Sequence, residues 1–143
     1  MMQRVAEHLY SIAITLWVGA LWAIGYLAAP VLFRLLDDRA LAGRVAGEMF
    51  TYVAWLGIAA AAYLLVFVAL RKEGGAFRSS VFWLVLLMLL LTVAGYFGVQ
   101  PILAQLKADS FPREVMESAL RDRFVAWHGV SSVVYLVQSL LGL

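Results

Sequence analysis

Long apolar runs alternate with short polar connections along this chain. Four runs lack any Asp, Glu, Lys or Arg, and they cover residues 9–33, 49–70, 81–99 and 124–143. Each is about as long as the ~20 residues that a helix needs to cross a bilayer's hydrocarbon core, whereas a barrel strand needs only about 9 to 11. The sequence therefore predicts an all-α integral membrane four-helix bundle with up-down topology. We expect one domain, residues 1–143, with spans at about 5–33, 48–71, 80–106 and 122–143.

Composition agrees with this prediction. Hydrophobic residues make up 64% of the chain and charged residues 14%, and the mean hydropathy is +0.90. Such values are typical of a membrane protein, and the short connections leave no room for a second, soluble domain. We expect the lipid bilayer as surroundings and no nucleic acid as a partner. The localisation we expect is a bacterial inner membrane, with both termini on the same side because the number of spans is even; the basic residues do not decide which side.

The start of the chain has a second interpretation. Arg4 before the first run and the small pair Ala28-Ala29 resemble the flanks of a cleaved signal peptide. The run is too long for a usual signal peptide, and it continues past Pro30 to Phe33. We therefore interpret it as a retained span.

The connections carry local signals. Asp37 and Asp38 can cap a helix that begins near Arg39, and the polar sequence Lys72-Glu73-Gly74-Gly75 predicts a tight turn in an antiparallel hairpin. We expect Pro101 to perturb the third span. After Asp109-Ser110 and Pro112, we expect a short interfacial helix before the last span, with an apolar face formed by Val115, Met116, Ala119 and Leu120.

Polar side chains recur at helical spacing within the spans. One stripe on the first span contains His8, Ser11, Thr15, Gly19 and Trp22, and one on the fourth contains His128, Ser131, Ser132, Tyr135, Gln138 and Ser139. We expect both stripes to face inward and to form a polar seam, to which the second span adds Tyr52, Trp55 and Tyr63 and the third adds Thr92, Tyr96 and Gln100. Two interpretations stay open. The seam is either a narrow ligand path or a set of hydrogen bonds between helices, each worth about 0.6 kcal/mol.

Chemistry within the membrane is limited to a few groups. No carboxylate lies inside the four runs, so a carboxylate relay for protons or cations has no carrier. His8 and His128 are the candidate metal or haem ligands, and without cysteine the chain has no thiolate site. Helical rise places the two histidines about half a bilayer apart, which disfavours one haem between them. The cofactor therefore stays open: none is expected first, with haem or copper as alternatives.

Several segments together resemble a known family. They are His8-Leu9 with Trp17 and Gly19, Phe33-Arg34-Leu35-Leu36, Ala42-Gly43, Gln100-Pro101 and the sequence Phe124-x-x-x-His128-Gly129-x-Ser131. This set is similar to the transmembrane protein 205-like domain family, and more distantly to the copper resistance D domain. The first resemblance implies a four-span bundle associated with drug and platinum tolerance and a role in transport. It also implies importance for His8, Pro101, His128, Ser131 and Ser132.

We therefore derive three functional hypotheses of different classes. The first is a transport or tolerance factor for a small solute or metal, acting through a polar seam whose candidate residues are His8, Ser11, Thr15, Tyr96, Gln100, Pro101, His128, Ser131, Ser132 and Tyr135. The second is a structural module that binds a copy of itself or another membrane protein through small residues such as Gly19 and Gly25. The third is a haem-binding redox protein. Whether the protein is an enzyme stays open, with the expectation leaning against it, and we assign no catalytic residue.

Overall fold

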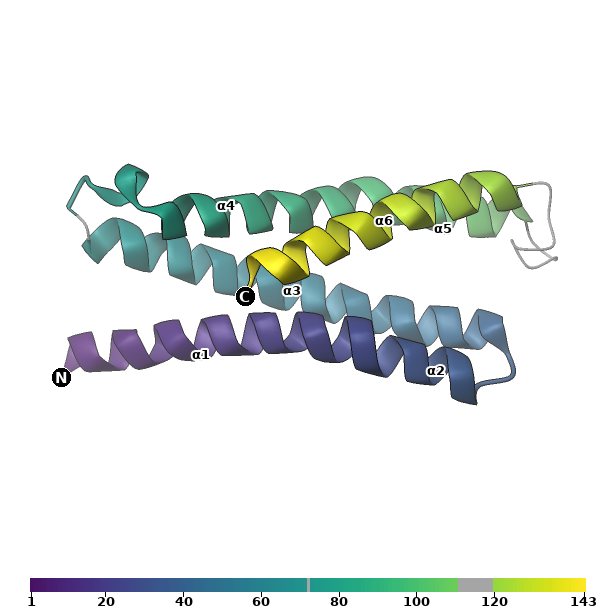
Figure 1. Ribbon diagram of the computed structural model, residues 1–143, viewed down its shortest axis with the longest axis horizontal. Helices are drawn as coiled ribbons and strands as arrows, with labels where there is room; N and C mark the ends of the chain where they lie inside the picture. Colours follow the sequence, from purple (N-terminus) through teal and green to yellow (C-terminus); the bar gives the residue numbers. More distant parts are fainter. Residues whose placement is uncertain (72, 111–119) are drawn as a thin grey trace.

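The computed structural model describes residues 1–71, 73–110 and 120–143. Over this part of the chain the regular elements are helices and no strand occurs. Four helical stretches are long and apolar enough to cross a membrane: span 1 (Met2–Leu35), span 2 (Arg39–Arg71), span 3 (Ser80–Asp109) and span 4 (Arg121–Leu141). Consecutive spans run in opposite directions along one long bundle (Figure 1). The predicted all-α membrane bundle is confirmed.

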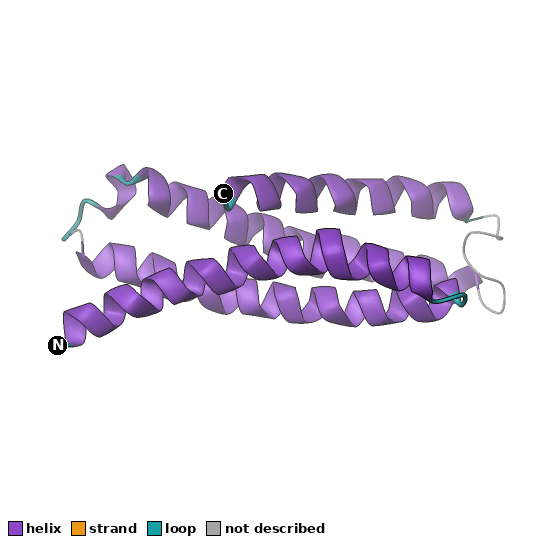
Figure 2. Ribbon diagram, turned by 60° about the horizontal axis from the view of Figure 1, so that its bottom comes forward, coloured by secondary structure: helices purple, strands orange, loops and turns teal. Residues whose placement is uncertain are grey.

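Spans 1 and 3 each consist of three helical pieces. Span 1 contains α1 (Met2–Trp22), the π-helical segment η1 (Ala23–Ala28) and α2 (Ala29–Leu35). Span 3 contains α4 (Ser80–Val93), the π-helical segment η3 (Ala94–Val99) and α5 (Gln100–Ser110). Span 2 is the single helix α3 (Arg39–Arg71), and span 4 is α6 (Arg121–Leu141). Figure 2 shows that the pieces of spans 1 and 3 continue one another.

Proline explains where the π-helical segments lie. The N–H of Ala29 bonds to the carbonyl of Ile24, five residues back, and the N–H of Gln100 bonds to that of Gly95. Pro30 and Pro101 follow directly, and a proline ring displaces the carbonyl four residues before it. A wider turn at this point accommodates the displaced carbonyl. The expected perturbation at Pro101 is confirmed, and a second one occurs at Pro30.

Two of the predicted connections lie in described residues. The N–H of Leu41 donates to Oδ1 of Asp38 at 3.0 Å, so the expected cap before Arg39 is confirmed. The turn after span 2 places Glu73 at φ 28° and Gly74 at φ 84°, and the short helix η2 (Ala76–Arg78) follows it. The interfacial helix expected before the last span falls mainly on residues 111–119, outside the described ranges.

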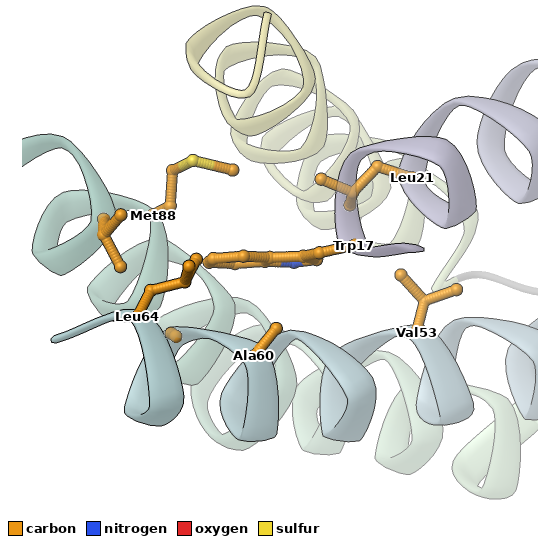
Figure 3. Close-up of a cluster of buried hydrophobic side chains, with 8 residues drawn as sticks. Trp17, Leu21, Val53, Ala60, Leu64 and Met88 are labelled. Carbon is orange, nitrogen blue, oxygen red and sulfur yellow. The ribbon is translucent and has the colours of Figure 1, made fainter. Parts of the chain in front are cut away.

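Span 2 lies between spans 1 and 3, and span 4 packs mainly against span 3. Trp17 of α1 is the centre of the core, where its indole lies between Leu21, Val53, Ala60, Leu64 and Met88 (Figure 3). It reaches α3 because Gly57 has no side chain: a Cβ there would lie 2.5 Å from Nε1 of Trp17. This core holds spans 1, 2 and 3 together near the middle of the bundle.

Candidate functional site

The face of α6 that turns toward the other spans is polar. Tyr135, Gln138 and Ser139 share this face because they are three and four residues apart. Gln138 is 5% exposed and Ser139 is fully buried. Buried polar side chains at membrane depth need partners inside the protein, because lipid provides none.

Ser139 connects α6 to span 1. The indole Nε1 of Trp22 donates to the Ser139 carbonyl at 3.2 Å, and the Tyr26 hydroxyl donates to the Ser139 hydroxyl at 3.1 Å. That serine hydroxyl in turn donates to the carbonyl of Tyr135, one turn back, at 2.7 Å. The hydroxyl of Ser139 is therefore donor and acceptor at once, and two aromatic side chains of span 1 donate hydrogen bonds to this residue.

Tyr135 donates across the same contact in the opposite direction, from span 4 to span 1. Its hydroxyl donates to the carbonyl of Leu21 on α1. The ring fits there because of Gly25 in η1, where a Cβ would lie 2.2 Å from Cε1 of Tyr135. Glycine is thus required at position 25 for Tyr135 to approach span 1 this closely.

A second polar contact joins α6 to span 3. The side-chain amide of Gln138 donates to the hydroxyl of Thr92, which is 6% exposed. The Thr92 hydroxyl donates to the carbonyl of Met88, one turn back, at 2.8 Å. The set that results joins three spans, and we call it the polar cluster; its members are Trp22, Tyr26, Thr92, Tyr135, Gln138 and Ser139.

Aromatic rings surround part of this cluster. The ring centroids of Trp22 and Tyr26 are 4.8 Å apart, and those of Tyr26 and Tyr135 are 5.9 Å apart. Phe50 of span 2 meets Tyr135 edge-on at 5.2 Å. We call these four rings the aromatic cluster. It lies where spans 1, 2 and 4 meet, and its members Trp22, Tyr26 and Tyr135 also belong to the polar cluster.

The stripe predicted on span 1 does not face inward, which corrects that expectation. His8, Ser11 and Thr15 are exposed on α1, as is Gly19. His8 Nδ1 contacts the carbonyl of Arg4 at 2.5 Å, and the hydroxyls of Ser11 and Thr15 donate to the carbonyls four residues back, at 3.2 Å and 2.8 Å. Each side chain is thus satisfied by its own helix. The stripe's last member, Trp22, does reach the polar cluster.

The first half of the stripe predicted on span 4 lies outside the cluster. His128 is exposed, and its ring stacks on Phe124 with centroids 5.8 Å apart. The hydroxyl of Ser132 donates to the backbone carbonyl of His128 at 2.9 Å, so the imidazole is not its partner. Ser132 is exposed and Ser131 is half-buried. These residues lie near the start of α6, away from Ser139.

Among the residues predicted on span 3, Thr92 belongs to the polar cluster, whereas Tyr96 and Gln100 do not. The hydroxyl of Tyr96 accepts a hydrogen bond from Nε1 of Trp55 at 3.3 Å. Gln100 is half-buried and Pro101 is exposed. Of the ten predicted site residues, Tyr135 is the one that the structure places in the polar cluster. Tyr26 was absent from every predicted stripe, although a Gly-Tyr pair preceding a proline occurs in span 1 as it does in span 3.

The two histidines lie toward opposite ends of the bundle. Tyr63 bonds to the carbonyl of Ala6, close to His8, whereas Gly43 lies near Lys107, whose Nζ is over the Phe124 ring one turn before His128. The residues from 43 to 63 span about 30 Å of α3, and each histidine lies a few residues further inward, which leaves about 20 Å between them. One haem ligated by both does not fit.

Metal ligation by a larger group of side chains is also not found in the described ranges. They contain no group of three or more His, Asp or Glu residues that could hold a metal ion. The chemistry that the arrangement does offer is hydrogen bonding by hydroxyl, indole and amide groups beside aromatic rings.

Comparison with known proteins adds the family. A family model described as a domain of unknown function (DUF4149) matches residues 12–112. No curated protein and no solved structure matches the chain. The matched range includes Trp22, Tyr26, Phe50 and Thr92, the partners that the first three spans present to α6. Because the match covers more than half of its length, the chain belongs to the DUF4149 family.

Proposed function

We propose that this membrane protein is a transport or tolerance factor for a small solute, and that the solute interacts with the polar cluster. The membrane we propose is a bacterial inner membrane. The resemblance of the histidine motif and neighbouring segments to the transmembrane protein 205-like family supports the same class of function. The residues that carry the proposal are those of the polar cluster rather than the two histidines.

One observation supports this proposal above all: polar side chains of three spans converge in one hydrogen-bonded cluster, in which Thr92, Gln138 and Ser139 are buried. A hydrogen bond between membrane helices contributes only about 0.6 kcal/mol on average. Trp22, Tyr26 and Tyr135 each donate across the contact between spans 1 and 4. Donors of this kind can exchange a protein acceptor for a solute acceptor at small cost.

The contact between spans 1 and 4 is also a suitable place for the solute to pass. It is the smallest of the contacts between neighbouring spans, and polar side chains carry much of it. The buried residues of the core around Trp17 come from spans 1, 2 and 3, and span 4 packs against them with the partly buried side chains of Tyr135 and Leu141. A shift of span 4 relative to span 1 would therefore leave the buried part of that core in place.

The test is growth of the host lacking this protein on a panel of neutral, metal-containing and organic-cation toxicants, with the gene restored. Thr92→Val removes the acceptor of Gln138, and Thr51→Val is the matched control because Thr51 also donates to the carbonyl four residues back, at 3.0 Å, without a partner from α6. We expect the wild type and Thr51→Val to protect and Thr92→Val to lose protection at equal protein level. Equal protection by both variants would refute a role for the cluster.

A second candidate function is a partner-binding module. The exposed face of α1 with His8, Ser11, Thr15 and Gly19 supports it, since polar and small side chains at lipid-facing positions are typical of helix–helix contacts. A Cβ at Gly19 would meet nothing within 4 Å, so another backbone has room to approach there. Crosslinking in membranes through a cysteine introduced at Gly19 tests it; absence of any crosslinked product would reject this candidate.

A further inference from the structure

The aromatic cluster brings ring faces and backbone carbonyls together, in addition to the hydrogen bonds of the polar cluster. Its four rings come from three spans, in the order Trp22, Tyr26, Tyr135 and Phe50, with neighbouring centroids 4.8, 5.9 and 5.2 Å apart. Two backbone carbonyls, those of Leu21 and Ser139, point into the same contact and accept from these side chains. Ring faces and carbonyl oxygens both carry partial negative charge.

Charge is otherwise missing from this part of the protein. Among the contacts given for these four rings over the described residues, none is to a charged side chain. A metal ion or a small ammonium ion would have to give up strongly bound water with no carboxylate to replace it. A large organic cation with delocalised or shielded charge is weakly hydrated and keeps its attraction to ring faces. The cluster therefore favours organic cations with an apolar body.

The cluster can be reached from the lipid. Tyr26 is 40% exposed, although it lies on a membrane span, while Trp22 and Tyr135 are half-buried. The Tyr26 ring is held by a single side-chain hydrogen bond, from its hydroxyl to Ser139. Turning this ring outward would uncover the faces of Trp22 and Tyr135 without disturbing the core around Trp17.

We propose that the aromatic cluster binds an organic cation with an apolar body, which arrives from the bilayer between spans 1 and 4. This inference rests on the proposed function and names its class of solute. The rings of Trp22, Tyr26 and Tyr135 supply the affinity, and the carbonyls of Leu21 and Ser139 add partial negative charge beside them.

The test is equilibrium binding of radiolabelled tetraphenylphosphonium to the purified protein in mild detergent. Tyr26→Phe keeps the ring but removes the bond to Ser139, whereas Tyr26→Leu removes both. We expect the Phe variant to bind within about twofold of the wild type and the Leu variant to bind about 3- to 30-fold more weakly, the range for one lost cation–ring contact. Tyr63→Leu is the control, since Tyr63 bonds to Ala6 away from the cluster, and its affinity should be unchanged.

The possible outcomes separate this inference from the function it rests on. An equal loss in the Phe and Leu variants would mean that the hydroxyl matters and the ring does not, and would overturn the inference. No binding to the wild type would overturn it as well. The binding assay tests the inference alone, since binding to the purified protein needs no transport. Protection of the host against neutral or metal-containing toxicants would support the transport proposal even if tetraphenylphosphonium does not bind.

Discussion

Replacement of Gly57 by alanine gives a direct test of how spans 1 and 2 are held together. A Cβ at this position would lie 2.5 Å from Nε1 and 3.0 Å from Cε2 of Trp17. Trp17 is 1% exposed and lies against Leu21 and Leu64, which are equally buried, so the indole has no free space to move into. Overpacking of this kind costs about 1–3 kcal/mol.

Gly47→Ala in the same helix is the matched control, because a Cβ there would meet nothing within 4 Å. Alanine is favoured over glycine in a helix by about 0.5–1 kcal/mol, and both variants receive this gain. The difference between them therefore isolates the contact with Trp17. We expect the free energy of unfolding of Gly57→Ala to lie about 1–3 kcal/mol below that of Gly47→Ala.

The assay is reversible unfolding of the purified protein in mild detergent, followed by far-ultraviolet circular dichroism. Combining Gly57→Ala with Trp17→Phe removes the atoms that clash, so the double variant should lose less stability than the two single variants added together. Equal stability of Gly57→Ala and Gly47→Ala, or strict additivity with Trp17→Phe, would refute this packing of the core.

Three further predictions concern the polar cluster, the contact between spans 1 and 4, and the ion pair of Arg71. Thr92→Val leaves the amide of Gln138 unpaired and should cost about 1–3 kcal/mol in the same unfolding assay. Gln138→Leu in the same chain should recover most of this loss, and no recovery would contradict the unpaired amide as its cause. Val18→Cys with Gly142→Cys should form a disulfide under oxidation, detected as loss of maleimide-reactive thiols in a chain otherwise free of cysteine. A Cβ at Gly142 would lie 2.9 Å from one methyl carbon of Val18, and since that carbon is one bond from the Val18 Cβ, the two Cβ atoms lie at most about 4.4 Å apart, within the ~3.5–4.5 Å of disulfides. This bond should block protection of the host until it is reduced, and full protection in the oxidised form would argue against movement between spans 1 and 4. Arg71→Met removes the exposed ion pair with Glu7 and should change the free energy of unfolding by less than about 1 kcal/mol; a larger loss would contradict a weak, water-screened contact.

The four spans could be predicted from the sequence because length and hydropathy alone decide whether a segment can cross a membrane. A backbone in lipid has to form helices of a fixed minimum length, and no tertiary information is needed to find them. The cap at Asp38 was predictable for a similar reason, since it depends on residues within one turn of each other. Which faces of the spans meet is a tertiary question, and there the sequence was less informative.

The polar cluster shows which of its residues the sequence did and did not predict to face inward. Gln138 and Ser139 were expected on an inward-facing stripe, and the structure buries both. Tyr26 was missing from the predicted stripe, although it follows Trp22, the last member of that stripe, by four residues and so shares its face. Helical spacing was therefore the available signal for Tyr26.

The outward orientation of His8, Ser11 and Thr15 follows from what each side chain can do within its own helix. Serine and threonine hydroxyls can donate to the carbonyl one turn back, so they need no partner from another span and can face lipid at little cost. The amide of Gln138 finds its partner only on another span, in Thr92, and a phenol such as Tyr135 also reaches past its own helix. Helical spacing alone therefore identifies a polar face without deciding whether it turns inward. Residue type does not decide it either: Tyr52 is 73% exposed on span 2, whereas Thr92 and Ser139 are buried although each also donates to a carbonyl one turn back.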